Sequence, residues 1–157
     1  MLHRKILQKK AEELKVKING ELVKTCRDGD LSAAKKYIER GANIRAWDDW
    51  PLRCAALYGH LDIVKYLVER ESNIHAGRDA ALRLAAYHGH LEVVKYLVEQ
   101  GANIHEWNDY VLRCAVDKGH LQVVNVIRKA VGDKYKCHRC IIKSTCLELC
   151  EDFRNGH

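Results

Sequence analysis

The sequence is poor in residues that break helices, and it contains no long apolar run. Its 157 residues include a single proline, whereas leucine, valine, alanine, lysine and glutamate are common; this composition favours helices. No apolar run approaches the roughly 20 residues that a membrane-spanning helix needs. The first five residues are not followed by the apolar stretch of a secretory leader either. We therefore expect an intracellular, cytoplasmic protein that does not associate with a membrane.

The motifs of common enzyme classes are also missing. The sequence has no glycine-rich phosphate-binding loop, no His-Glu-x-x-His helix and no recognisable Ser-His-Asp arrangement. It therefore predicts no catalytic residue, no enzyme activity and no small-molecule substrate.

Positive charge and cysteine are present in excess. Lys and Arg number 27 against 21 Asp and Glu, a net charge of +6, and much of this excess lies in residues 1–17. Such a basic end can bind nucleic acid weakly through phosphates, or it can be an ordinary solvated helix face. Seven cysteines without a secretory leader indicate a reducing compartment, with free thiols or a bound metal.

An internal repeat of 30 residues dominates the chain. The dipeptides that mark it are Gly29-Asp30, Gly59-His60, Gly89-His90 and Gly119-His120. A second block, Leu-Arg-Cys-Ala-Ala with small changes, recurs at residues 52–56, 82–86 and 112–116. Each unit predicts two short helices, and the second carries an apolar stripe at helical spacing, for example Leu61, Val64 and Leu67. One unit cannot bury this stripe alone, so the repeats predict a solenoid in which neighbours cover each other.

The repeat divides the chain into three parts. Residues 18–131 form four helix pairs, expected near 18–41, 50–71, 80–101 and 109–131. Residues 1–17 are expected to be a basic helix that covers the open end of the stack. Residues 132–157 form a cysteine-rich C-terminal segment that caps the other end, since a solenoid needs polar or covered termini.

The repeated residues resemble the ankyrin repeat. The pattern Ala-Ala-x-x-Gly-His-Leu-x-x-Val-x-x-Leu-x-x-x-Gly-Ala-x-Ile is carried most fully by residues 85–104, and by parts of residues 55–67 and 115–124. The resemblance covers roughly residues 20–131 and implies an all-α solenoid of stacked helix-turn-helix units. The 30-residue variety is similar to the ankyrin arrays of giant DNA viruses of amoebae, which implies a viral protein that acts in a host cell.

The chain departs from the family pattern at the loops. The usual unit has about 33 residues, and the shortfall lies between Trp47 and Trp50 and between Trp107 and Tyr110, where the family forms a β-hairpin finger. We therefore expect shortened loops in place of these fingers. The family's Thr-Pro-Leu-His becomes Trp50-Pro51-Leu52-Arg53 in the second repeat, so the capping threonine and the bridging histidine are lost.

Three aspartates at one phase of the repeat, Asp49, Asp79 and Asp109, are interpreted as replacement caps. An aspartate carboxylate at a helix N-cap accepts hydrogen bonds from the first turn. Each aspartate also lies four residues before an arginine, so we expect the pairs Asp49 with Arg53, Asp79 with Arg83 and Asp109 with Arg113.

Positions that differ between the copies indicate a binding face. In the family these positions are loop tips and the exposed end of the first helix, and aromatic residues are common interface anchors. The predicted protein-binding residues are Trp47, Asp48, Trp50, Leu57, Tyr58, Arg78, Tyr87, His88, Trp107, Asn108, Tyr110, Asp117 and Lys118. For Trp47 and Trp107 the alternative is that their rings fill the space of the missing finger.

The repeated histidines are interpreted as structural. His60, His90 and His120 share one phase and match the family's Gly-His, where the side chain orients the turn. His75 and His105 share another phase and are expected to make hydrogen bonds within their loops.

Seven cysteines fall into two sets. Cys26, Cys54 and Cys114 lie in the repeats and are expected to be small core residues. Cys137, Cys140, Cys146 and Cys150 lie in the tail with the spacing C-x2-C-x5-C-x3-C. Four thiolates at such spacing can bind zinc; a plain capping helix over residues 141–153 and redox pairing of Cys137 with Cys140 are the alternatives. No other cofactor is expected.

Three functions remain open at this point. The resemblance implies a non-enzymatic module that binds another protein through the variable face. The first alternative is nucleic-acid binding by the basic N-terminus and a zinc-bearing tail, and the second is a substrate adaptor for a ubiquitin ligase. The sequence has no clear F-box-like segment for the adaptor, and its modest charge excess makes nucleic acid the weaker partner.

Overall fold

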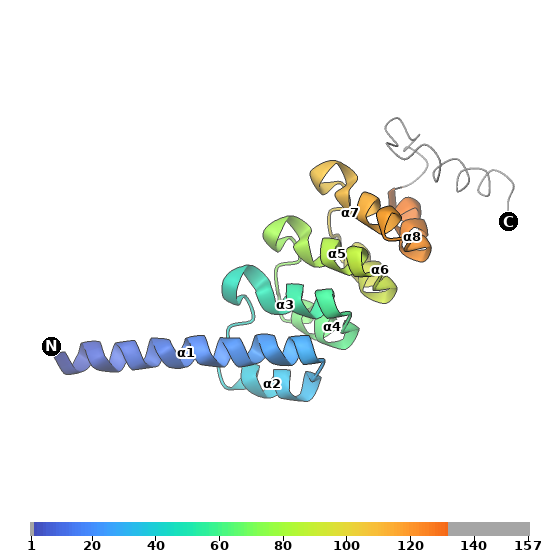
Figure 1. Cartoon of the computed structure of the whole chain (residues 1–157). Helices are drawn as coiled ribbons and strands as arrows, with labels where there is room; N and C mark the ends of the chain where they lie inside the picture. The colour runs from blue at the N-terminus through green and yellow to red at the C-terminus, as the bar shows by residue number, and fades with distance from the viewer. Residues whose placement is uncertain (1, 132–157) are drawn as a thin grey trace, which may run out of the picture.

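The computed structural model describes the backbone of residues 2–131 and the side chains of residues 4–105 and 110–130. Within these residues the chain forms eight helices and no strand, which confirms the expected all-α solenoid (Figure 1). The helices are α1 (Leu2–Asp28), α2 (Leu31–Glu39), α3 (Ala46–Tyr58), α4 (Leu61–Glu69), α5 (Ala76–His88), α6 (Leu91–Glu99), α7 (Glu106–Asp117) and α8 (Leu121–Val131).

The helices stack as four pairs in two rows. The first helices of the pairs contact one another in the order α1, α3, α5 and α7, and the second helices in the order α2, α4, α6 and α8 (Figure 1). Each first helix also packs against the second helix of its own pair. None of the described helices combines the length and the apolar character that crossing a bilayer requires.

One continuous hydrophobic core runs through the stack. The apolar stripe of each second helix is buried, for example Ile63, Val64 and Leu67 in α4. Ala55 and Ala56 in α3 are completely buried, because small side chains let neighbouring first helices approach closely. The period of the sequence therefore predicts both the helices and the faces they bury.

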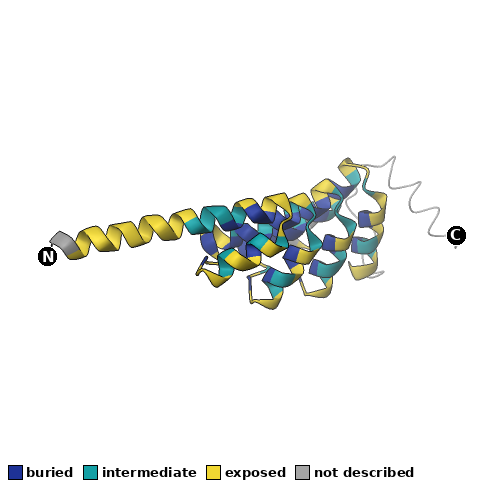
Figure 2. Cartoon of the chain, turned by 90° about the horizontal axis from the view of Figure 1, so that it is seen from below, coloured by how far each residue is buried: buried dark blue, intermediate teal, exposed yellow. Residues whose placement is uncertain are grey.

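The N-terminal helix α1 differs from expectation. Residues 2–28 form one helix, and residues 4–17 are exposed along their whole length, so this end of α1 extends beyond the stack (Figures 1 and 2). The expectation that residues 1–17 cover the open end is therefore wrong for the described part of that segment. The helix first packs on the core at Ile18.

Left-handed turns replace the hairpin fingers. Trp47, Asp48 and Asp49 have φ values of 53°, 60° and 53°, and the next repeat places Gly77, Arg78 and Asp79 in the same conformation. Each non-glycine residue in this region costs roughly 1–2 kcal/mol of backbone strain. The turns therefore persist only because contacts around them compensate for this strain.

Glu71 is strained at a position where two other repeats have glycine. Its φ is 65°, and Gly41 and Gly101 have φ values of 91° and 92° at the same phase. We predict that Glu71→Gly raises the free energy of unfolding by about 0.5–1 kcal/mol, because glycine adopts this conformation without a Cβ clash. Arg45 Nε donates to the main-chain oxygen of residue 71 at 2.8 Å, so this bond survives the change.

Urea unfolding measures this effect, and Gly101→Glu is the reciprocal control. The control is expected to lower stability by a similar amount, since the space around Gly101 is open and only its backbone conformation opposes a side chain. A Glu71→Gly variant that is less stable than the wild type would contradict the strain argument.

The three repeat cysteines are buried, as expected. Cys26, Cys54 and Cys114 are 0%, 4% and 6% exposed. Burial, with a smaller contribution from nearby Cys54, raises the pKa of the Cys26 thiol from 9.0 to about 12. The unfolded chain therefore loses this proton at a lower pH than the folded chain does.

This difference predicts a loss of stability in alkali. The contribution of Cys26 is fully present below about pH 9 and falls as the pH rises towards 12, by about 2 kcal/mol at pH 10.5. Urea unfolding of the reduced protein at pH 7.5 and pH 10.5 measures the loss, and Cys26→Ala serves as the reference for all other titrating groups. Equal losses in the wild type and in Cys26→Ala would contradict the prediction.

Candidate functional site

A ladder of side-chain oxygens holds each repeat to the next. The main-chain N–H groups of Asn73 and Asn103 donate to the carboxylates of Asp49 and Asp79, at 2.7 Å and 2.8 Å. In the first repeat Asn19 takes the place of the aspartate and accepts from Asn43 N at 2.8 Å. The oxygens therefore lie in one repeat and the N–H groups in the following loop.

This geometry corrects the expected caps and ion pairs. The Asp49 and Asp79 side chains are buried, at 5% and 3% exposure, and they bind the next repeat instead of their own first turn. Arg53 contacts Asp48, at 3.3 Å from Nη1 to Oδ2, and not Asp49. The side chain of Asp109 lies outside the described residues.

The buried aspartates have further partners. His75 Nδ1 lies 2.9 Å from Asp79 Oδ1, so this histidine bonds within its own loop as expected. Burial raises the pKa of Asp49, although the hydrogen bond from Asn73 N and the nearby Arg45 oppose the shift. These contacts fix the left-handed turns at the start of α3 and α5.

A second ladder uses the histidines that follow the repeated glycines. The Nε2 atoms of His60, His90 and His120 lie 2.8, 2.9 and 3.0 Å from main-chain oxygens of the preceding repeat, those of Arg27, Leu57 and Tyr87. The structural interpretation of these histidines is confirmed. Their bonds join neighbouring repeats, however, instead of closing a turn within one repeat.

The glycines make room for these imidazoles. Gly59 caps α3 with a φ of 79°, and a Cβ at this position would lie 2.5 Å from His90 Nδ1. Gly29 and Gly89 face His60 and His120 in the same way. In Gly59-His60 and Gly89-His90, the glycine therefore makes room for the histidine of the following repeat, and the histidine bonds to a main-chain oxygen of the preceding repeat.

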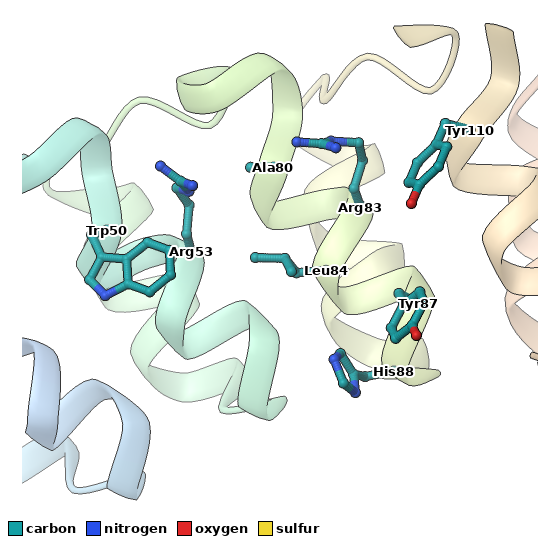
Figure 3. A pocket seen from close by; sticks show the side chains of 8 residues that line it. All are labelled: Trp50, Arg53, Ala80, Arg83, Leu84, Tyr87, His88 and Tyr110. Atoms are coloured by element: carbon teal, nitrogen blue, oxygen red, sulfur yellow. The ribbon is translucent and has the colours of Figure 1, made fainter. Parts of the chain in front are cut away.

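The two ladders fix the first helices side by side, and a groove opens between three of them. We define the first-helix groove by the eight residues that line a cavity of about 430 Å³ on α3, α5 and α7 (Figure 3). These residues are Trp50, Arg53, Ala80, Arg83, Leu84, Tyr87, His88 and Tyr110.

A small residue makes space at the centre of the groove. Ala80 occupies the phase at which the repeats before and after it carry Trp50 and Tyr110. In Figure 3 Ala80 lies between the side chains of Arg53 and Arg83. The cavity therefore depends on one repeat having alanine where its neighbours have a large ring.

Cations stack on the aromatic rings of this face. The Arg53 guanidinium lies 4.8 Å from the Trp50 ring, Lys118 Nζ lies 4.5 Å from the Tyr87 ring, and the Arg83 guanidinium lies 5.9 Å from the Tyr110 ring. Such contacts restrict both partners, so the face presents ordered rings and ordered positive charges together.

The structure places only some of the predicted binding residues in the groove. Four of them line the groove: Trp50, Tyr87, His88 and Tyr110. Leu57 is half-buried, and the exposed residues outside the groove are Trp47, Asp48, Tyr58, Arg78, Asp117 and Lys118. Trp47 is 52% exposed. This exposure favours a solvent-facing ring over a ring that is packed between adjacent loops. The side chains of Trp107 and Asn108 lie outside the described residues.

The sequence comparison missed the arginines of the groove. Arg53 and Arg83 recur unchanged in each full repeat, so a search for positions that vary between copies excludes them. Leu84 was missed because the other repeats have a buried cysteine at its phase. The signal that could have found the arginines is their position one turn after the variable residues Trp50 and Ala80, on the same helix face.

The structure leaves the zinc hypothesis untested. The residues whose side chains are described contain no group of three potential ligands among His, Cys, Asp and Glu. Cys137, Cys140, Cys146 and Cys150, with the capping-helix and redox alternatives, lie outside the described residues.

Comparison with known families identifies the repeat. A family model described as ankyrin repeats (3 copies) matches residues 22–108 and residues 75–139. The two matches together span well over half of the chain. No curated protein matches the sequence.

Proposed function

This chain belongs to the ankyrin-repeat family, and from that premise we propose that it binds another protein in the first-helix groove and catalyses no reaction. Ankyrin repeats generally serve as protein-interaction modules. The observation that carries the proposal is the cavity of about 430 Å³ lined by rings from three successive repeats. Aromatic residues beside a pocket are typical of interface anchors.

The rigidity of the face supports this function. The two ladders join α3 to the loops on either side of α5, since Asn73 N bonds to Asp49 and His90 bonds to the Leu57 oxygen. A face held in this way loses little conformational freedom on binding, and preorganisation favours affinity. Trp47, Tyr58 and Lys118 are exposed as well, and we assign them to the rim of this binding face.

We further propose an intracellular setting with a host protein as the partner. The three described cysteines are free thiols, which is consistent with a reducing compartment. The similarity of the 30-residue repeats to viral ankyrin arrays makes amoebal proteins the first partners to test.

Affinity capture from nuclease-treated amoebal lysate tests the proposed function. The bait is the full chain, compared with the groove variant Trp50→Ala/Tyr87→Ala/Tyr110→Ala. The matched control carries Lys36→Ala and Asp62→Ala, two exposed positions on the second helices. Circular dichroism and thermal unfolding establish that each bait is folded.

The expected result is a protein that the wild type and the control retain and the groove variant loses. A partner retained equally by all three baits would place binding outside the groove. Recovery that depends on nucleic acid would favour the alternative, for which the exposed basic residues of α1, such as Lys9 and Lys10, are the candidate site.

A further inference from the structure

Two positive side chains converge on one glycine at the edge of the groove. The Arg53 guanidinium carbon lies 3.3 Å from the position that a Cβ would take at Gly77. Arg83 Nη2 donates to the Gly77 oxygen at 3.1 Å. The repeats before and after have tryptophan at the phase of Gly77, so the glycine leaves room for both groups.

Among the residues whose side chains are described, the lining of the groove contains no acidic residue. Its titratable side chains are Arg53, Arg83, His88 and two tyrosines. The carboxylate of Asp48 meets Arg53 from outside the groove, where the aspartate side chain is 63% exposed. Arg53 and Arg83 approach Gly77 at its Cβ position and at its carbonyl oxygen, and two positive groups beside a largely aromatic cavity favour an anionic occupant.

The arginines are held in a way that suits carboxylate binding. Their guanidinium carbons lie 4.8 Å and 5.9 Å from the centres of the Trp50 and Tyr110 rings, and a guanidinium recognises carboxylates through the N–H groups in its plane. Both arginines arise from adjacent first helices and flank Ala80, as Figure 3 shows.

Part of the cavity is lined by apolar side chains. Ala80 and Leu84 lie between α3 and α5, beside the arginines, and Tyr87 lies on the side of α5 that faces α7 (Figure 3). A volume of about 430 Å³ holds a few side chains of a peptide. An occupant that fits both parts has an acidic side chain next to an apolar one.

We propose that the first-helix groove binds an acidic segment of the partner protein, with an Asp or Glu carboxylate seated at Arg53 and Arg83 and a neighbouring apolar side chain over Ala80 and Leu84. The inference rests on the proposed function, because it describes what the partner presents to the groove. It adds the chemistry that the partner must have.

A library of random dodecapeptides displayed on phage tests the inference with the full chain as target. The selected peptides are expected to be enriched in Asp or Glu at one position near an aliphatic or aromatic residue. One selected peptide is then synthesised in three forms, with the acid, with the corresponding amide, and with phosphoserine. Fluorescence anisotropy measures their affinities in low and high salt.

Four variants accompany the peptides. Arg53→Gln and Arg83→Gln are each expected to lower the affinity for the acidic peptide about tenfold or more, since hydrogen bonds to charged groups are among the strongest. Arg53→Lys keeps the positive charge but lacks the planar guanidinium, and it is expected to lose less affinity than Arg53→Gln. Ala80→Tyr fills the cavity with a ring that the same phase accommodates in the next repeat, and it is expected to abolish binding.

The outcomes separate the inference from the proposed function. If the acid and amide peptides bind equally and Ala80→Tyr still blocks both, the groove binds peptides but the acidic partner is wrong. If Arg53→Gln and Ala80→Tyr bind every peptide as the wild type does, the groove is not the site and both proposals fail. Selection of no peptide, or tighter binding of the phosphoserine form, also contradicts the carboxylate assignment.

Discussion

Replacing Gly59 with alanine is expected to lower the free energy of unfolding by about 3 kcal/mol, the sum of two effects. The residue caps α3 with a φ of 79°, which costs an alanine roughly 1–2 kcal/mol. The added Cβ would also lie 2.5 Å from His90 Nδ1, so the imidazole must move. Movement breaks its hydrogen bond to the Leu57 oxygen, which joins two repeats.

The matched control is Gly101→Ala. Gly101 has a φ of 92°, and an alanine Cβ there meets no atom within 4 Å. This variant carries only the backbone cost and is expected to lose about 1–2 kcal/mol. Urea unfolding monitored by circular dichroism measures both variants, and equal losses would show that the imidazole contact contributes nothing.

A double variant isolates the contact itself. In a His90→Ala background the Cβ of Gly59→Ala no longer meets a ring, so the second substitution is expected to cost about 1–2 kcal/mol, as at Gly101. Costs that simply add would contradict the proposed coupling between the cap of one repeat and the histidine of the next.

Replacing Asp79 with alanine is expected to have a similarly large effect, a loss of about 3 kcal/mol. Asp79 is 3% exposed, and its carboxylate accepts from Asn103 N at 2.8 Å, with His75 Nδ1 at 2.9 Å. Its removal leaves a main-chain N–H without its acceptor. The position also has a φ of 55°, which alanine tolerates poorly.

Asp79→Asn distinguishes the hydrogen bond from the charge. Asparagine keeps an acceptor oxygen and adopts left-handed conformations more readily than most residues, so this variant is expected to lose about 1 kcal/mol or less. Asp62→Ala, at an exposed position of α4, controls for the loss of a carboxylate and is expected to change stability by less than about 0.5 kcal/mol. Similar losses for Asp79→Ala and Asp79→Asn would contradict the assigned role.

The fold could be predicted from the sequence because the sequence consists of repeats. Four copies of one apolar pattern place the helices and their buried faces, and Val64 and Leu67 are buried as predicted. The position of the N-terminal end of α1 could not be predicted in this way. Leu7 and Leu14 form an apolar edge in the sequence, but they remain 55% and 57% exposed. Helical spacing predicts a face but not whether a neighbour covers it.

The contacts between repeats were harder to predict than the helices. Aspartate does cap a helix locally at Asp30, whose carboxylate accepts from Ala33 N at 2.8 Å. Asp49 and Asp79 share that chemistry but reach a loop 24 residues further along the chain. Sequence patterns favour the nearest donor, whereas the left-handed turn before α3 and α5 redirects the carboxylate to the next repeat.

The groove was predicted in part. The variable aromatics Trp50 and Tyr110 were identified correctly as lying on one face, because both occupy the same phase on first helices. Arg53 and Arg83 were assigned to local ion pairs, and their convergence on Gly77 depends on a loop conformation that spacing alone does not specify.

Hydrogen–deuterium exchange of the captured complex tests the central claim most directly. Binding in the first-helix groove predicts slower exchange in peptides from α3, α5 and the part of α7 that contains Tyr110, with α2, α4 and the exposed end of α1 unchanged. Protection confined to the exposed end of α1 or to the second helices would contradict the account, since the partner would then bind a surface that the groove does not include.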